Sequence, residues 1–197
     1  MKSADSPHGI VVIGASWGGV IAIRKILGCL SKDFPLPIAI VQHRLKSSEN
    51  ILARILGASC LMPLREPDDK EPLQNGHVYL APGGYHMLLE NAHISLSVDD
   101  PVHYSRPSID VLFESAADAY QDRSIGVLLT GANRDGASGL RRIEDMGGRI
   151  IIQDPATAES PCMPTAGIEQ TLQPFIVALD QIGPFLAAVG RDFLPRS

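Results

Sequence analysis

Residues 14–19 read GASWGG and directly follow the apolar run 10–13 (IVVI), which predicts a glycine-rich turn between a strand and a helix. Such a turn supports two kinds of chemistry. It can cradle a phosphate group with backbone N–H groups, or it can expose a serine as a nucleophile. The first interpretation predicts a nucleotide-binding protein and the second predicts a hydrolase.

The phosphate-cradle interpretation fails on two patterns. The dinucleotide pattern needs a glycine where Ser16 stands, and an acidic residue at the end of the second strand to hold a ribose. That strand ends in Gln42, His43 and Arg44, with no carboxylate. The other phosphate-binding pattern fails because no Gly-Lys-Ser/Thr follows the glycines. The serine is therefore the group that needs an explanation.

Ser16 lies in the pattern G-x-S-x-G, in which glycines flank the serine because a sharp strand-to-helix turn crowds any Cβ atom. An alternative role for Ser16 is that of a helix N-cap. His43 favours the nucleophile, because it ends the second strand and adjacent strands are about 4.8 Å apart. The other five histidines have no such position; they are His8, His77, His86, His93 and His103.

A third group should orient the imidazole of His43 and stabilise its protonated form. Asp135 is the candidate, because it lies in the turn 130–137 (TGANRDGA) after the predicted strand 124–130. Its alternative role is an ordinary helix N-cap. Asp154, after the next strand, and Asp110, at a helix start, are rival candidates. The chain order Ser, His, Asp differs from the Ser, Asp/Glu, His order of the α/β-hydrolase fold.

The elements that must position these residues follow a strand–helix alternation. Short apolar runs without strict alternation predict strands covered on both faces, at residues 10–13, 38–42, 124–130, 149–153 and 175–178. Helical patterns lie between them, at residues 19–30, 50–56, 108–120, 137–146 and 164–170. This order predicts an α/β fold with a doubly wound, mainly parallel sheet and helices on both faces.

The middle of the chain departs from that alternation. Residues 76–89, followed by 93–98, predict a strand, then a loop, then a β-hairpin that turns near Glu90 and Asn91. We expect this hairpin as an antiparallel flank of the main sheet. The polar stretch 65–74 is interpreted as a surface connection.

Length and composition narrow the class of protein. The 197 residues suffice for one domain with a substantial core, and the content of 45% hydrophobic and 20% charged residues excludes wholesale disorder. The net charge of −5 argues against a nucleic-acid partner. The glycine-rich stretch 9–23 is too short to cross a membrane. Three scattered cysteines, Cys29, Cys60 and Cys162, argue against disulfides and a zinc site and favour a cytoplasmic protein.

Several segments together carry a family resemblance. The most specific are 106–113 (RPSIDVLF) and 76–83 (GHVYLAPG); the others are 13–16 (IGAS) with the glycines at 18 and 19, 41–43 (VQH), 86–87 (HM), 129–131 (LTG) with 135–137 (DGA), and 163–164 (MP). With these segments, in this order, the chain resembles the catalytic domain of CheB-type protein-glutamate methylesterases, which modify chemotaxis receptors. The resemblance spans residues 10 to about 170.

The resemblance implies a serine hydrolase that removes methyl esters from glutamate side chains of receptor helices, and that could also deamidate glutamine. The family's nucleophile falls on Ser16, its base on His43 and its acid on Asp135. Backbone N–H groups near Trp17 and Ala132 would form the oxyanion hole. No metal or organic cofactor is implied, and a separate response regulator or signalling protein is a possible partner.

The domain expectation is one catalytic domain over residues 1–197, without the family's receiver domain, because the first strand begins at residue 10. It is either a standalone methylesterase or a separated catalytic domain. The sequence also departs from the family's usual pattern: Trp17 replaces a small polar residue, Ala132 replaces a methionine, and residues 44–46 (RLK) replace Met-Pro-Pro. Arg44, Lys46, Arg106 and Arg134 could make the catalytic edge locally positive, and the alternative is that they are scattered, solvated charges. Two alternative functions stay open, a catalytically idle binding module and an esterase for small metabolites.

Overall fold

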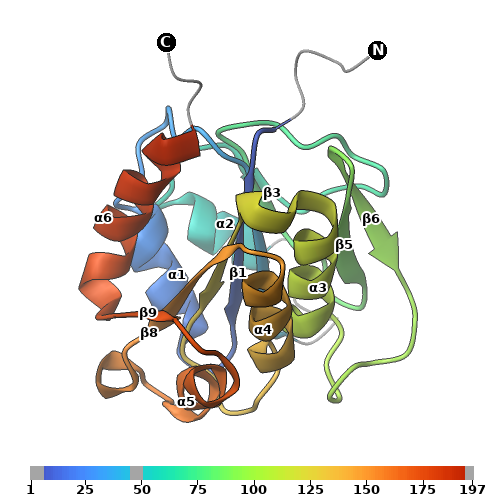
Figure 1. Ribbon diagram of the computed structural model, residues 1–197. Helices are drawn as coiled ribbons and strands as arrows, with labels where there is room; N and C mark the ends of the chain where they lie inside the picture. The colour runs from blue at the N-terminus through green and yellow to red at the C-terminus, as the bar shows by residue number, and fades with distance from the viewer. Residues whose placement is uncertain (1–6, 45–50, 194–197) are drawn as a thin grey trace.

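The computed structural model describes residues 7–44 and 51–193, and its central feature is one parallel sheet of seven strands. The strand order is β3-β4-β2-β1-β7-β8-β9. In chain order the strands are β1 (Ile10–Ala15), β2 (Ile38–Gln42), β3 (Leu64–Arg65), β4 (Val78–Leu80), β7 (Ser124–Leu128), β8 (Arg149–Gln153) and β9 (Phe175–Val177). The carboxyl ends of the strands point toward the bottom of Figure 1. The candidate site residues were expected at this edge.

Helices cover both faces of the sheet, as predicted (Figure 1). One face packs against α1 (Gly19–Leu27) and α6 (Leu179–Gly190), and the other against α3 (Ile109–Tyr120), α4 (Ala137–Asp145) and α5 (Cys162–Gln170). Helix α2 (Ile51–Gly57) lies near β3, and short 3-10 turns span Gln121–Arg123, Pro155–Thr157 and Arg191–Phe193. Along β1, Val11 and Ile13 face one core and Ile10 and Val12 the other, which explains an apolar run without polar alternation.

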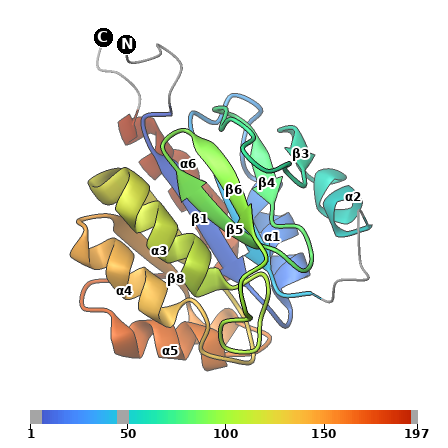
Figure 2. The ribbon, with the colours of Figure 1, turned by 90° about the vertical axis from the view of Figure 1, so that its right-hand side faces the viewer.

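The predicted hairpin is present as β5 (His86–Glu90) and β6 (His93–Ser97), which pair antiparallel around the expected turn. It forms a two-stranded sheet of its own and lies beside α3 (Figure 2). Met87, Leu89 and Ile94 bury their side chains in the core that α3 shares with the main sheet. The hairpin therefore flanks the main sheet by packing, and not by backbone hydrogen bonds to its edge.

Two elements were not predicted. Strand β3 takes the edge next to β4 and begins at Leu64, so the stretch 65–74 is only in part a surface connection. Helix α6 contains Pro184, and a proline inside a helical pattern argues against a helix from sequence. Packing against α1 provides the stabilisation that propensity lacks. The predicted helix at residues 50–56 begins at Asn50, which lies outside the described residues.

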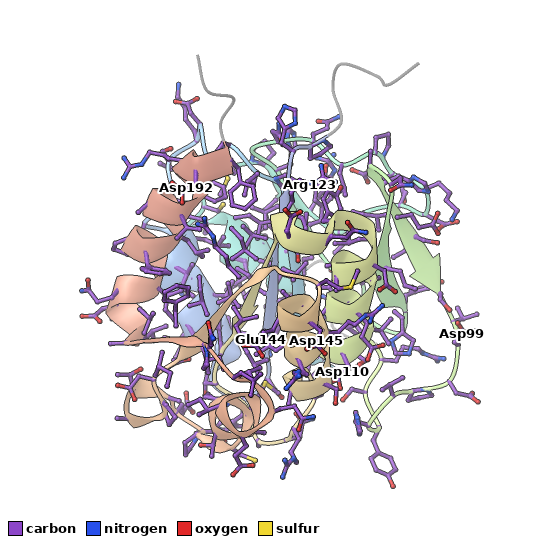
Figure 3. All side chains as sticks on the ribbon, in the orientation of Figure 1. Asp99, Asp110, Arg123, Glu144, Asp145 and Asp192 are labelled. Carbon is purple, nitrogen blue, oxygen red and sulfur yellow. The ribbon has the colours of Figure 1, made fainter. Side chains whose placement is uncertain are left out.

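Helices α3 and α4 are joined at their N-termini by two carboxylates that each cap the other helix. Asp135, just before α4, accepts hydrogen bonds from the backbone N–H groups of Ile109 (2.8 Å) and Asp110 (3.0 Å) in α3. Asp110 in turn accepts from the N–H groups of Gly136 (2.9 Å) and Gly139 (2.7 Å). Asp110, labelled in Figure 3, lies at the end of α3 beside α4. Both helix starts are thus fixed relative to one another.

The two carboxylates differ in their electrostatics. Burial raises the pKa of Asp110 to about 6; the charges of Asp135 and Glu114 act in the same direction, while the Gly139 hydrogen bond and His103 oppose it. Burial alone would also raise the pKa of Asp135. The hydrogen bonds from His43 and from the two α3 N–H groups outweigh burial and lower it below its usual range.

Asp110→Asn should stabilise the protein at neutral pH, because the amide oxygen can accept the same two N–H groups without a buried charge. Since folding raises the pKa of Asp110, the stability linked to its protonated form is complete below about pH 4 and is lost as the pH rises through about 6. Urea unfolding should show a gain for Asp110→Asn of about 2 kcal/mol at pH 8 that disappears near pH 4.

Asp110→Ala is the matched control for that measurement. It removes the acceptor together with the charge, so it should lower the free energy of unfolding relative to Asp110→Asn at every pH. An equal gain for Asp110→Asn at pH 4 and pH 8 would contradict the electrostatic argument.

Candidate active site

Ser16 and His43 follow the ends of two adjacent strands. Ala15 of β1 pairs with Gln42 of β2, so Ser16 and His43 are the next residue on each strand. The His43 N–H group donates to the Ala15 carbonyl (3.0 Å), and the Ser16 N–H group donates to the Thr130 carbonyl after β7 (3.0 Å). The sheet therefore brings together the three segments that carry the predicted site residues.

The turn after β1 places Ser16 outside α1. The N-cap of α1 is Gly18, whose φ of 78° lies in the left-handed region that favours glycine. Ser16 is partly exposed and does not cap the helix. The alternative role of Ser16 as an N-cap is therefore wrong, and its hydroxyl makes no capping hydrogen bond to α1.

His43 and Asp135 are in direct contact. The His43 Nε2–H group donates to Asp135 Oδ2 at 2.7 Å, with the Asp135 side chain fully buried and that of His43 11% exposed. The remaining ring nitrogen, Nδ1, lies 3.5 Å from the Asn133 amide nitrogen. Within the described residues no hydrogen bond joins the Ser16 hydroxyl to the His43 ring. Such contacts are often loose in a protein without substrate.

Each oxygen of Asp135 accepts two hydrogen bonds. Oδ2 accepts from His43 and from the Ile109 N–H group, and Oδ1 accepts from the Ser108 hydroxyl (2.9 Å) and the Asp110 N–H group. Four donors keep this buried carboxylate ionised, consistent with its lowered pKa. An ionised Asp135 requires a proton on Nε2, so Nδ1 of a neutral His43 carries a lone pair that can accept a proton and that the Asn133 amide approaches at 3.5 Å.

The rival carboxylates do not contact His43. Asp154 caps the 3-10 turn after β8, where its Oδ1 accepts from the Ala156 N–H group (2.9 Å). The Asp110 carboxylate is held by the N–H groups at the start of α4 and lies 3.5 Å from His103. Of the three candidates, Asp135 alone is in position to orient His43.

Trp17 and Ala132 each present a backbone N–H group next to these side chains. Trp17 follows Ser16, and Ala132 lies in the loop after β7, two residues beyond the carbonyl that holds Ser16. Neither N–H group donates to another residue in the described ranges 7–44 and 51–193. The Trp17 indole is 65% exposed, so it does not fold into the core. Both N–H groups are available to a developing negative charge.

A cavity of about 490 Å³ opens beside His43. It is lined by His43, Arg44 and Gly84, and by the loop residues Pro101 and 104–107. Sequence reasoning placed Arg106 near the catalytic edge but did not identify the rest of this loop as part of the site. The nearby R-P-S-x-D motif at 106–110 was the available signal, since its serine binds Asp135. The contact of Asn133 with His43 was not predicted either, although Asn133 lies in the same loop as Asp135.

Of the four cations that could make the catalytic edge positive, two are paired with glutamates. The Arg44 side chain is buried, pairs with Glu66 (2.8 Å) and donates to the Ala81 carbonyl (2.7 Å). Arg134 lies 3.4 Å from Glu169. Arg106 donates to two backbone carbonyls, those of Val98 and Asp99, and forms no ion pair with a carboxylate of the described residues. Leu45 and Lys46 lie outside the described residues.

The described part of the chain lacks the features of two other classes of site. No group of three or more His, Cys, Asp or Glu side chains there could hold a metal ion. None of its helices is long and apolar enough to cross a membrane. Cys29, Cys60 and Cys162 are unpaired.

Comparison with known proteins decides the family. The sequence profile of the CheB methylesterases matches residues 11–186. The chain belongs to the CheB methylesterase family. The crystal structure of the Thermotoga maritima CheB methylesterase catalytic domain superposes with a TM-score of 0.87 at 32% identity, over 92% of this chain and 98% of that one. The predicted family, fold class and enzyme class, a carboxylic ester hydrolase, are thereby confirmed.

Relatives in the CheB family differ in length. A protein of Leptospira interrogans is 46% identical over 94% of this chain and 97% of its own length. The protein-glutamate methylesterase/protein-glutamine glutaminase 2 of Caulobacter vibrioides is 40% identical, and the corresponding enzyme of Bordetella pertussis is 41% identical. The chain spans 55% and 54% of these two relatives, about half of their length.

Asp135→Asn should impair both catalysis and folding. Whichever way the amide turns, its NH₂ group meets donors, because each carboxylate oxygen accepts two hydrogen bonds. We expect ester hydrolysis to fall by about 10³- to 10⁴-fold and the free energy of unfolding at pH 7 to fall by about 1–3 kcal/mol. Because folding lowers the pKa of Asp135, the stability difference should shrink as the pH falls below about 4.

The matched control is Asp154→Asn, whose amide oxygen can keep the cap on Ala156. Hydrolysis of 4-nitrophenyl acetate and urea unfolding should both stay near the parent values. Normal turnover in Asp135→Asn together with a loss in Asp154→Asn would move the orienting role to Asp154.

Proposed function

We propose that this chain is a protein-glutamate methylesterase that works through Ser16, His43 and Asp135. The observation that carries the proposal is the 2.7 Å contact between the buried Asp135 carboxylate and His43, at the strand end beside Ser16. A histidine held by a carboxylate next to a serine is the arrangement that activates a hydroxyl nucleophile. Family membership supports the ester as the bond that is attacked.

The first half of the reaction acylates Ser16. As the Ser16 oxygen bonds to the ester carbonyl carbon, its proton passes to Nδ1 of His43, and the imidazolium is stabilised by Asp135 through Nε2–H. His43 then returns the proton to the methoxide, which leaves as methanol. The ring nitrogens exchange the roles that they have in the serine-protease triad, where the aspartate binds Nδ1.

The second half removes the acyl group. His43 takes a proton from water, the hydroxide attacks the acyl-enzyme, and Ser16 regains its proton as the glutamate carboxylate is released. In both halves the Trp17 and Ala132 N–H groups hold the oxyanion, an interaction that is often worth about 3–4 kcal/mol per donor. With a glutamine side chain the leaving group is ammonia, so the same residues support deamidation.

We propose that the substrate is a methylated glutamate on a receptor helix. The Caulobacter and Bordetella relatives are named protein-glutamate methylesterases, which supports glutamate as the residue that carries the ester. The exposed cavity beside His43 provides a place for the polypeptide on either side of the ester. We propose that residues 1–197 work as a single catalytic domain with a separate response regulator or signalling protein as partner. Unpaired cysteines are consistent with work in the cytoplasm.

Ser16→Ala should abolish hydrolysis of 4-nitrophenyl acetate and demethylation of a methylated receptor, because it removes the hydroxyl that forms the acyl-enzyme. Release of 4-nitrophenol and of methanol provides the two measurements. Ser97→Ala in the hairpin is the control and should retain both activities. A parent protein without either activity would favour the idle binding module, and activity on small esters alone would favour the metabolite esterase.

Trp17→Thr should separate substrate access from chemistry. The backbone N–H group at position 17 survives the substitution, whereas the exposed indole next to the nucleophile is removed. We expect faster demethylation of a receptor segment and nearly unchanged hydrolysis of 4-nitrophenyl acetate. Ile21→Thr, which changes an exposed side chain farther along α1, is the control. Equal changes on both substrates would show that Trp17 acts through stability or through the oxyanion hole.

A further inference from the structure

The peptide unit that carries the Trp17 N–H group is held by its carbonyl. That carbonyl belongs to Ser16, and it accepts hydrogen bonds from the Gln42 side-chain amide (Nε2, 2.8 Å) and from the Gly19 N–H group (2.9 Å). In a trans peptide unit the C=O and N–H groups point in opposite directions. Fixing the Ser16 carbonyl on the protein side therefore turns the Trp17 N–H group outward.

Gln42 is built into this position. Its side chain is buried, and the same Nε2 group also donates to the His43 carbonyl (3.1 Å). The opposite orientation of the amide would place Oε1 against two carbonyl oxygens, so the donor role is dictated by its neighbours. Gly19 makes room for it, because a Cβ atom there would collide with Oε1.

The orientation that lets Nε2 donate to both carbonyls leaves the side-chain oxygen of Gln42 unsatisfied. Oε1 is buried and has no hydrogen-bond partner among the residues that the structure describes. A buried acceptor without a partner lowers stability. A glutamine kept for stability alone would have both ends satisfied, so the arrangement favours a role for Nε2 in the geometry of the Ser16 and His43 backbones.

The peptide unit that carries the Ala132 N–H group is held in the same way. Its carbonyl belongs to Gly131 and accepts from the Ser160 hydroxyl (3.0 Å) and from the Met163 N–H group (2.9 Å). The Gly131 N–H group donates to the Ser160 carbonyl (3.1 Å), so Ser160 contacts this loop on both sides of Gly131. The Ala132 N–H group is consequently directed away from Ser160 and Met163.

We infer that Gln42 and Ser160 are positioning residues for the oxyanion hole. Each fixes the carbonyl of one peptide unit and thereby aims the N–H group at the other end of that unit. The inference rests on the proposed function, and it assigns roles to two side chains that do not themselves touch the ester. Donors fixed before the reaction stabilise the developing charge without reorganisation, which is the source of their catalytic effect.

The test compares an oxygen ester with its sulfur analogue in the full chain. In 4-nitrophenyl thionoacetate a C=S group replaces the C=O group of 4-nitrophenyl acetate, and sulfur is a larger and weaker acceptor for aimed N–H donors. Ser160→Ala should lower kcat for the oxygen ester by about 10-fold, and Gln42→Met by up to about 100-fold, with KM nearly unchanged. The rate on the thionoester should change little, so the preference for oxygen should fall by the same factors.

Two further variants separate positioning from folding. Ser160→Thr keeps the hydroxyl and should restore the preference for the oxygen ester. Thr165→Val, which removes an exposed hydroxyl from α5, should leave both rates unchanged. The Ser160 variants keep the test decisive if Gln42→Met does not fold.

The outcomes distinguish this inference from the proposed function. Equal loss on both esters in Ser160→Ala would show a general structural effect and overturn the positioning role, while Ser16-dependent hydrolysis by the parent would still stand. Parent hydrolysis that survives Ser16→Ala would overturn the proposed function, and the inference that rests on it as well.

Discussion

The carboxylate of Asp135 accepts four hydrogen bonds, one from His43 and three from the start of α3. A buried negative charge is tolerated only where donors of this kind replace its hydration. The N-terminus of α3 provides two of them as backbone N–H groups, which would otherwise lack partners within the helix. The same contact that keeps Asp135 ionised therefore also determines where α3 begins and how the His43 ring is oriented.

Asp110 completes this arrangement from the other side. The N-cap of α4 is a glycine, and the Ser108 side chain does not cap its own helix α3, so neither helix caps itself with a side chain. Each is capped by the carboxylate of its neighbour. The high pKa of Asp110 and the low pKa of Asp135 show how unequal the two sites are: the four donors of Asp135 include a histidine, whereas Asp110 has only backbone groups and a distant His103.

The nucleophile turn depends on its neighbours as much as on its own glycines. Ser16 lies between the ends of β2 and β7: Gln42 holds its carbonyl, and the Thr130 carbonyl holds its N–H group. The Thr130 hydroxyl also donates to the Trp17 carbonyl (2.9 Å). Such contacts restrict the turn without burying its hydroxyl, and they are possible because parallel strands end at one edge of the sheet.

The sequence by itself determined the strand–helix alternation, the strand ends that carry Ser16 and His43, and Asp135 as the leading candidate among three carboxylates. These follow from local signals: apolar runs, glycine turns and polar residues placed directly after strands. Such signals did not predict helix α6 or strand β3. Helix α6 contains Pro184 and depends on packing, and the two-residue edge strand β3 depends on pairing with a distant segment. Only the tertiary structure could decide that Asp135 caps α3, that Asp110 caps α4, and that Gln42 holds Ser16. Each of these contacts joins residues more than 20 positions apart, and hydrogen-bond geometry between such residues is set by the packing of the elements that carry them.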